Sequence, residues 1–268
     1  MGKALLSRWL ADGIAAESLF VRDPRPADWL TRVEGIHLNE PFPDQPAGIV
    51  IATRPPDVDK ILPSLEAYGG GGTLIMSIAA SKPLSLFEAH FSKGTPVVRA
   101  MPNLPATVGA AITAYVTNGK LSDDQKALFV RLITCVGTVV EMPEEDLLPI
   151  VTALSGAGPA YVFAMAEAFA AAGLELGLPE DLSHELAIKM IAGAGRMLAE
   201  PEADATGFRV AVTSKGGTTE AGMLEFMADE HGIQDLVKRT VEAAALRCGE
   251  ISGQQRHQDP ADLKVIKD

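Results

Sequence analysis

The 268-residue sequence has little cysteine and little histidine, and each shortage excludes a class of protein. Only Cys135 and Cys248 occur, far fewer than a secreted disulfide scaffold uses, and they form no CxxC pair. We expect both thiols to be small, buried hydrophobic side chains. The five histidines show no spacing typical of metal ligands, and none lies beside a cysteine, so we expect no metal site.

Basic residues are also in short supply. Lys and Arg number 23 against 35 Asp and Glu, which gives a formal net charge of −12. So acidic a chain lacks the broad basic face that binds nucleic acid or an anionic membrane, and we expect neither partner. The start shows no secretory signal, and the longest uncharged stretch, residues 150–166, is interrupted by Gly156, Gly158 and Pro159. We therefore expect a cytoplasmic protein with no membrane span.

The first half of the chain alternates strand-like and helix-like segments. Continuous apolar runs are typical of strands buried on both faces, and helical spacing of apolar residues appears between several of them, for example at 56–68 and 123–134. This alternation predicts an α/β domain with a parallel sheet and right-handed crossovers. The expected strands are residues 18–22, 48–53, 73–78, 96–101, 111–116 and 137–142.

The second half shows no convincing strand beyond about residue 147, which predicts an α/β domain over residues 1–148 and an all-helical domain over residues 149–268. The segment 159–172 is apolar nearly all round, and a helix without a polar face must be covered on every side. We therefore expect a partner subunit to cover it. The polar tail from Ser252 is expected to be loosely held. Further helices are expected at 180–198, 221–228 and 233–248.

Open α/β domains bind ligands beyond the carboxyl ends of their strands, so the residues after each strand are of most interest. The segment Arg99-Ala-Met-Pro-Asn-Leu-Pro105 places two prolines around Asn103, whose amide both donates and accepts. This pattern fits a ligand contact, and it also fits a rigid turn whose Asn satisfies local backbone groups.

The segment Val212-Thr-Ser-Lys-Gly-Gly-Thr-Thr219 joins an apolar run to a predicted helix. Two glycines let backbone N–H groups converge, the helix start adds a positive dipole end, and two threonines add hydroxyl donors. The combination suits a carboxylate. The alternative is an ordinary helix start capped by a Ser or Thr side chain.

Three blocks, 99–105, 153–161 and 212–219, together resemble the pyrroline-5-carboxylate reductase family in order and spacing, over the whole chain. The resemblance implies an N-terminal Rossmann domain and a C-terminal helical domain that interlocks with a partner subunit. It implies reduction of 1-pyrroline-5-carboxylate to proline, with NADPH or NADH as hydride donor. It also implies a homodimer, or a decamer built from dimers. No metal is implied.

The same resemblance implies a substrate site in the helical half. The N–H groups of Gly216, Gly217 and Thr218, in the loop that begins at Ser214, would hold the substrate carboxylate. Thr219 would be the catalytic residue, its hydroxyl bonded to the ring nitrogen or the carboxylate. Glu202 matches an acidic position lining the family's site, and it reads equally well as a solvated surface residue.

The implied cofactor site lies in the first half, and Met101, Pro102 and Asn103 would border the nicotinamide. After the strand at 18–22, Arg22 suits the 2′-phosphate of NADP whereas Asp23 suits the ribose hydroxyl of NAD, and the family favours NADP. The remaining cofactor positions implied are Gly2, Ala52, Thr53, Arg54, Pro55, Ile78 and Ala79.

The chain departs from the family at its start. The family opens with a strand and a Gly-x-Gly-Asn-Met-Gly turn, and Met1-Gly2 matches only the end of that turn. Either the natural protein begins upstream, which the intact blocks elsewhere favour, or this is a short paralogue. A paralogue with weakened cofactor binding would be a non-catalytic helical assembly protein. Arg8 stands where the family often has Gly, and we expect it to crowd the first helix against the sheet.

A third interpretation, a reductase of the related β-hydroxyacid type, has less support in the sequence. Those enzymes use a catalytic lysine. Lys189 lies in a predicted helix without the partner block expected around such a residue.

Overall fold

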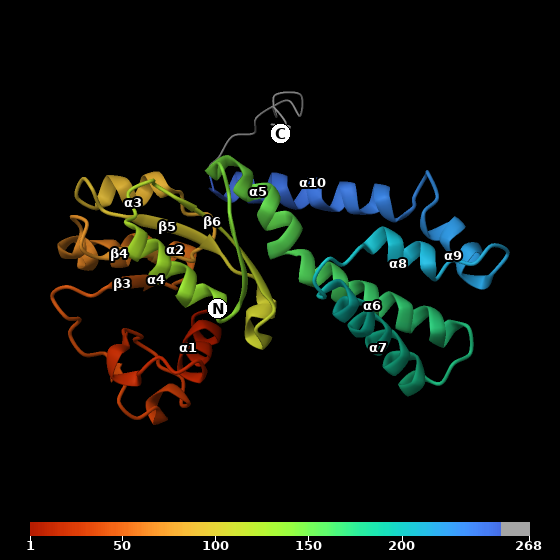
Figure 1. Cartoon of the computed structure of the whole chain (residues 1–268), viewed down its shortest axis with the longest axis horizontal. Coiled ribbons are helices and arrows are strands. Elements are labelled where there is room, and N and C mark those ends of the chain that lie inside the picture. The colour runs from red at the N-terminus through yellow and green to blue at the C-terminus, as the bar shows by residue number, and fades with distance from the viewer. Residues whose placement is uncertain (253–268) are drawn as a thin grey trace. The chain divides into compact units, whose positions relative to one another are not determined.

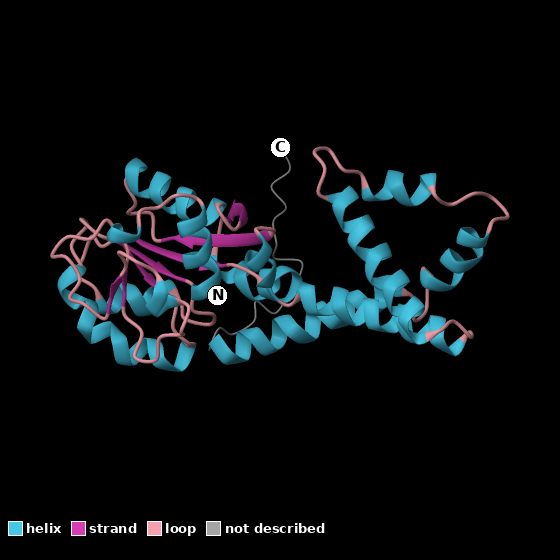
Figure 2. Cartoon of the chain, turned by 90° about the horizontal axis from the view of Figure 1, so that it is seen from below, coloured by secondary structure: helices cyan, strands magenta, loops and turns pink. Residues whose placement is uncertain are grey.

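The computed structural model describes residues 1–252, and residues 253–268 lie outside the described part. The chain forms two compact units, one of residues 1–156 together with residues 245–252, and one of residues 157–244. Every strand described lies in the first unit, and the described second unit is helical (Figures 1 and 2). The prediction of a sheet domain followed by a helical region is confirmed. All but the first residue of the predicted tail falls outside the described residues.

A five-stranded sheet forms the centre of the first unit, with its strands in the order in which they are numbered. Neighbouring strands are parallel except for β5 and β6, which are antiparallel. The short turn η4 (Leu104–Val108) joins those two, and a parallel pair requires a crossover of a dozen or more residues. The strands are β3 (Gly48–Ile51), β4 (Leu74–Ser77), β5 (Val97–Met101), β6 (Ala111–Thr117) and β7 (Gly137–Glu141).

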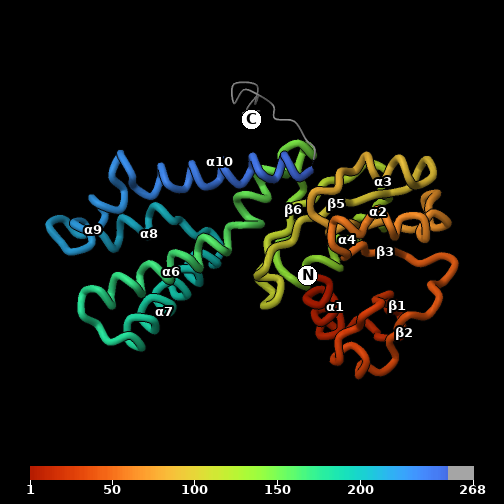
Figure 3. The backbone as a smooth tube through the Cα atoms, turned by 180° about the vertical axis from the view of Figure 1, so that it is seen from behind, coloured from red at the N-terminus to blue at the C-terminus, as the bar shows by residue number. Residues whose placement is uncertain are grey.

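A second, two-stranded sheet is formed by β1 (Phe20–Val21) and β2 (His37–Leu38), which run parallel. Figure 3 shows the pair beside the first helix. The rings of Phe20 and His37 stack with their centroids 4.1 Å apart. The strand β2 was not predicted from the sequence, because two residues among polar neighbours form no apolar run. The short turn η1 (Ala16–Ser18) precedes β1, and η2 (Leu30–Arg32) lies between β1 and β2.

Helices cover both faces of the five-stranded sheet. Alternate residues of β5 point to opposite sides: Val98 and Ala100 join the core beneath α1 and α4, while Val97 and Met101 join the core beneath α2 and α3. Burial on both faces explains the continuous apolar runs. The covering elements are α1 (Gly2–Ala11), α2 (Pro55–Ile61), η3 (Leu62–Tyr68), α3 (Leu84–His90) and α4 (Asp123–Thr134).

The Arg8 side chain of α1 lies against one glycine in the turn that follows η4. Its guanidinium lies against Gly109, which has a φ of +75° and no Cβ to obstruct the side chain. Leu5 in the same helix is fully buried, so α1 packs closely. The expected crowding is therefore relieved by Gly109 in the turn after η4.

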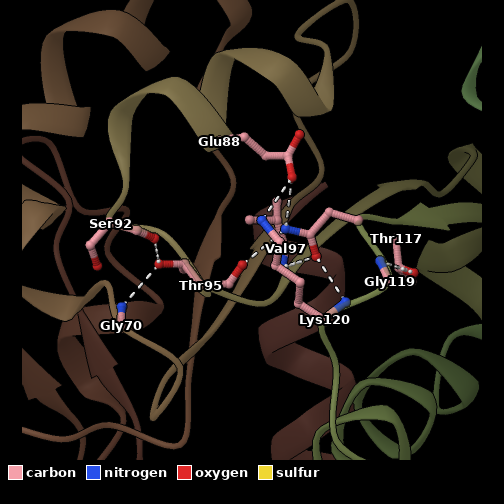
Figure 4. A network of polar contacts seen from close by, with 9 residues as sticks. Gly70, Glu88, Ser92, Thr95, Val97, Thr117, Gly119 and Lys120 are labelled. Carbon is pink, nitrogen blue, oxygen red and sulfur yellow. Dashed lines mark hydrogen bonds and ion pairs between the residues drawn. The ribbon is translucent and has the colours of Figure 1, made fainter.

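A hydrogen-bond network fastens the edge of the sheet where β5 begins (Figure 4). The side-chain oxygen of Asn118 accepts from the Val97 N–H (3.1 Å), and its NH₂ group donates to the Thr95 carbonyl (2.9 Å). Glu88 accepts from that NH₂ group (3.3 Å) and from Lys120 (3.1 Å). These bonds tie the start of β5 to the end of β6, at the edge opposite Met101.

Four helices of the second half, α6, α7, α9 and α10, fall on the predicted segments, and α9 begins three residues before the predicted start at 221. The short helix α8 was not predicted. The antiparallel pair α6 and α7 is joined by a bond from the Ser183 hydroxyl to the Ala170 carbonyl (2.6 Å). The linking turns η5 (Glu145–Leu147), α5 (Leu148–Val151) and the π-turn η6 (Thr152–Gly156) precede them. The helices are α6 (Gly158–Glu175), α7 (Glu180–Leu198), α8 (Ala205–Ala211), α9 (Thr218–Phe226) and α10 (Ile233–Ser252).

The apolar helix α6 packs against α7 and is only partly covered within the described chain. Phe163 is 54% exposed, Val162 42% and Phe169 43%, and Ala170 is its buried residue. By length and composition alone the helical run Glu145–Glu175 is long and apolar enough to cross a membrane. The π-turn at Thr152–Gly156 interrupts that run. The expected burial of this helix therefore needs a surface from outside the chain.

The prediction that both cysteines are buried is wrong, because each is only half-buried. The Cys135 thiol donates to the Leu132 carbonyl (3.0 Å). Burial, with a smaller contribution from the nearby Asp12 charge, raises the pKa of Cys135 to about 11. This thiol is therefore neutral at physiological pH.

Candidate functional site

The predicted cofactor residues that follow β3, β4 and β5 lie at one edge of the sheet. The register pairs Ile51 with Ser77 and Ser77 with Arg99, so the three parallel strands end together. The Ile78 N–H donates to the Ile51 carbonyl (3.0 Å), which continues the ladder one residue beyond β4. The carboxyl ends of parallel strands are where open α/β sheets bind their ligands.

Gly2 lies at the same edge. A Cβ built on it would stand 3.3 Å from the Ala52 Cβ, so the first residue of α1 touches the segment leaving β3. The first N–H groups of an α-helix have no partner within the helix, and its N-terminus carries a partial positive charge. This edge therefore offers the close backbone and the amide donors that suit a dinucleotide diphosphate.

Beyond Ala52, the segment leaving β3 is only partly free to bind a ligand. Arg54 precedes Pro55 at the start of α2, and its guanidinium bonds the Asp57 carboxylate (2.9 and 3.1 Å). Hydrogen bonds from Lys60 and then Arg54 lower the pKa of Asp57. The Thr53 hydroxyl oxygen is buried and has no partner among the described residues.

The segment that follows β5 is buried and is held in place by hydrogen bonds. Met101, Pro102 and Asn103 are all buried. The Asn103 amide donates to the Ser155 carbonyl (3.0 Å) and accepts from the Ile112 N–H (3.1 Å). Both bonds go to backbone groups, as the rigid-turn interpretation requires. Asn103 thus fixes the position of this segment against the π-turn.

Arg22 and Asp23 stand apart from these residues in the hydrogen-bonding pattern, because β1 belongs to the two-stranded sheet. Asp23 accepts from the Arg25 N–H (2.9 Å), and the Asn39 amide bonds the Asp23 backbone at both N–H and carbonyl (2.9 Å each). The Arg22 guanidinium lies 4.5 Å from the centroid of the Phe42 ring. An acidic and a basic side chain are therefore both held at the end of β1.

The loop before α9 forms a tight turn in the second unit. The Gly217 N–H donates to the Ser214 carbonyl (3.0 Å), and Gly216 has a φ of +72°, a conformation that favours glycine. The Gly216 N–H donates to the Glu220 carboxylate (2.7 Å). Two of the three N–H groups assigned to the substrate carboxylate are thus bonded within the loop.

The first turn of α9 retains free donors. Within the described part of the chain, the N–H groups of Thr218 and Thr219 have no hydrogen-bond partner, and both side chains are exposed. An α-helix leaves its first N–H groups unsatisfied, and an anion can accept from them. Of the three N–H groups predicted to hold a carboxylate, that of Thr218 is free, and the neighbouring Thr219 N–H is free as well.

Glu202 occupies a strained turn between α7 and α8. The Ala203 N–H donates to the Glu200 carbonyl (3.2 Å), and Glu202 itself has a φ of +62°. A side chain in this left-handed region is uncommon, and such residues concentrate at functional sites. Glu202 is exposed, so its burial does not distinguish a functional role from a surface role.

The sequence analysis did not identify one charged pair. Arg99 is 2% exposed and bonds the Glu145 carboxylate at 2.5 Å, and that carboxylate also accepts from the Leu84 N–H (2.9 Å). The available signal was a charged residue within an apolar strand, which requires a buried partner. The pair holds β5, and therefore Met101, against α3 and the segment before α5. No group of three or more metal-ligating side chains occurs in residues 1–252.

A mainly parallel sheet with helices on both faces, a helix N-terminus at its carboxyl edge and a separate helical unit define a Rossmann-like dinucleotide-binding oxidoreductase. Comparison with known proteins agrees. A family model for pyrroline-5-carboxylate reductase dimerisation matches residues 145–251. The chain is 35% identical to the pyrroline-5-carboxylate reductase of a Synechocystis species over 257 residues, covering 94% of each chain, and 30% identical to that of Pseudomonas aeruginosa, covering 95% and 94%.

Solved structures are similar over nearly the whole chain. The pyrroline-5-carboxylate reductase of Coxiella burnetii is 29% identical with a TM-score of 0.85, covering 93% of this chain and 94% of its own. The Plasmodium falciparum enzyme, with NADP bound, is 24% identical with a TM-score of 0.77 and shares the fold. The chain therefore belongs to the pyrroline-5-carboxylate reductase family, which consists of soluble NAD(P)H-dependent oxidoreductases. Its dimerisation region makes it a homo-oligomer.

Proposed function

We propose that this protein reduces 1-pyrroline-5-carboxylate to L-proline with NADPH or NADH in proline biosynthesis. Family membership supports the reaction, since the chain covers 94% of a relative of that name. The structural observation that carries it is the segment Ser214–Thr219, which leads into α9 and includes its first two residues. The nicotinamide cofactor supplies the hydride. The chain binds and orients the two reactants.

We assign substrate binding to the turn that leads into α9. The free N–H groups of Thr218 and Thr219 would donate to the substrate carboxylate, joined by those of Gly216 and Gly217 when they leave their partners in the turn, with Ser214 shaping the turn. The exposed Thr219 hydroxyl would bond the ring nitrogen, which orients the C=N bond and supports its protonated, more electrophilic form. Glu202 would line the same site.

We assign cofactor binding to the carboxyl edge of the sheet, where the donors and close backbone approach fit a dinucleotide. Gly2 at the start of α1 would take the diphosphate, and Arg22 or Asp23 would meet the adenosine ribose. Met101, Pro102 and Asn103 would border the nicotinamide. The other edge residues assigned are Ala52, Thr53, Arg54, Pro55, Ile78 and Ala79.

We also propose that one further strand, added before Met1, would complete this half. The sheets β1–β2 and β3–β7 are separate, and their parallel strands β1 and β3 support a strand that pairs with both and continues through a glycine turn into α1. A central strand supplies several backbone hydrogen bonds to its neighbours. Each buried backbone group left without a partner destabilises the fold by an amount on the order of 1–3 kcal/mol. The restored chain should therefore bind cofactor more tightly than residues 1–268.

The direct test is the loss of NADPH absorbance on adding the cyclic imine. It should be run on residues 1–268 and on a chain extended with the upstream strand. Proline formation by the extended chain supports the proposal. No turnover by the extended chain with either NADPH or NADH would contradict it.

A non-catalytic assembly protein is the second candidate, and the split between the two sheets is the observation that favours it. A helical dimer attached to a weakened nucleotide domain would assemble without catalysing. Calorimetry with NADPH separates the two: tight binding to residues 1–268 eliminates the assembly protein, and no detectable binding supports it.

We propose further that the cofactor half ends at residue 148, that the helical half from 149 onward forms a homodimer, and that dimers build a decamer. We propose a cytoplasmic location, and the acidic composition supports an enzyme that binds neither nucleic acid nor an anionic membrane. Light scattering on the purified protein would separate dimer from decamer.

A further inference from the structure

The turn before α9 already holds a carboxylate that belongs to the chain. The Gly216 N–H donates to Glu220 Oε2 at 2.7 Å. Glu220 lies in the first turn of the helix whose Thr218 and Thr219 N–H groups stay free. An internal anion thus occupies one donor of a cradle that suits an external anion.

We propose that Glu220 is an internal competitor that sets the affinity of this turn for carboxylate ligands. An incoming carboxylate that takes the Gly216 N–H must displace the Glu220 carboxylate. The displaced group stays on the same short helix and repels a second negative charge nearby. Both effects weaken ligand binding, and neither alters how the bound ligand reacts. The inference rests on the proposed substrate site for its physiological ligand.

Glu220 also has an ordinary structural interpretation, as a helix-capping side chain that orders the turn. The two roles predict opposite effects. Removing a competitor tightens ligand binding. Removing a cap loosens the turn and therefore weakens ligand binding. The substitution Glu220→Gln separates them, because glutamine keeps an oxygen that can accept from Gly216 and loses the charge.

A hydrogen bond to a charged acceptor is roughly twice as strong as one to a neutral acceptor. We therefore expect Glu220→Gln to lower the KM for 1-pyrroline-5-carboxylate and the Kd of L-proline by about five- to tenfold, with kcat nearly unchanged. The matched control is Glu225→Gln, which removes the same charge from an exposed position of the same helix. It should leave both constants within about twofold.

The experiment measures L-proline and acetate binding to the full chain by calorimetry, and steady-state reduction with the extended chain. Tighter binding in Glu220→Gln but not in Glu225→Gln supports the inference. Unchanged or weaker binding in Glu220→Gln overturns it, and so does a large fall in kcat, which would make the Glu220 charge part of the reaction.

Acetate separates this inference from the proposed function. If no variant reduces the imine or binds L-proline, the proposed function fails. Acetate affinity then decides the inference by itself: a tighter complex with Glu220→Gln supports an internal competitor, and an equal or weaker one contradicts it.

Discussion

At the residue scale, the chemistry assigned to this protein depends on one hydroxyl. Thr219 is exposed in the first turn of α9, beside unpaired N–H groups. We expect Thr219→Ala to reduce kcat/KM by about 1–3 kcal/mol, or roughly 5- to 150-fold, because one transition-state hydrogen bond is lost. Thr219→Ser retains the hydroxyl and should recover most of the rate. Equal rates for the alanine variant and the parent would remove Thr219 from the mechanism.

Glu202 allows strain and function to be measured in the same variant. Its φ of +62° is costly for a side chain, and glycine removes that cost. We expect Glu202→Gly to raise the free energy of unfolding by up to about 1 kcal/mol in urea denaturation, while kcat/KM falls. Glu202→Gln, which keeps the side chain and removes the charge, should show the fall without the gain. A stabilised variant with full activity would make Glu202 an ordinary surface residue.

Individual residues were also where the sequence was least informative. The resemblance placed Asn103 beside the nicotinamide, and the structure adds two backbone bonds that occupy its amide. The Arg99–Glu145 pair joins positions 46 residues apart, and no local pattern reveals such a partner. Long-range pairs depend on how the elements pack, which a single sequence does not encode locally.

At the scale of elements, α1 and the turn after η4 are coupled through Arg8 and Gly109. Adding a Cβ at Gly109 would strain a φ of +75° and collide with the Arg8 guanidinium. We expect Gly109→Ala to destabilise the protein by about 1–3 kcal/mol in urea denaturation. In an Arg8→Ala background the same change should destabilise the protein only through the strain of a positive φ at alanine, by about 1 kcal/mol. Equal costs in the two backgrounds would mean that Arg8 and Gly109 are not coupled.

Most elements were predictable from apolar periodicity. Both α4 (Asp123–Thr134) and α7 (Glu180–Leu198) match their predicted ranges, because each combines helical spacing with clear boundaries. Ser122 caps α4 reciprocally with Gln125, and such a capping box marks a helix start in the sequence. By contrast β2 was missed, since its pairing with β1 is a tertiary contact rather than a local preference.

At the scale of the whole molecule, the exposed apolar side chains of α6 require a partner. Phe163 is 54% exposed within the region matched by the dimerisation family. We expect Phe163→Glu to weaken self-association by about 2 kcal/mol or more, roughly 30-fold in Kd, as sedimentation or light scattering would measure. The matched control is Val108→Glu, which charges an apolar side chain, 70% exposed, outside that region. Equal effects of the two changes would place the interface elsewhere.

The activity proposed for the whole protein is transfer of a hydride to the imine carbon of 1-pyrroline-5-carboxylate. Deuterium transfer tests that claim most directly. NADPH carrying deuterium at both C4 positions is incubated with the imine and the extended protein, and the proline is analysed by mass spectrometry. We predict proline with one deuterium at the carbon that was the imine carbon. Proline without deuterium, or no proline at all, would contradict the account.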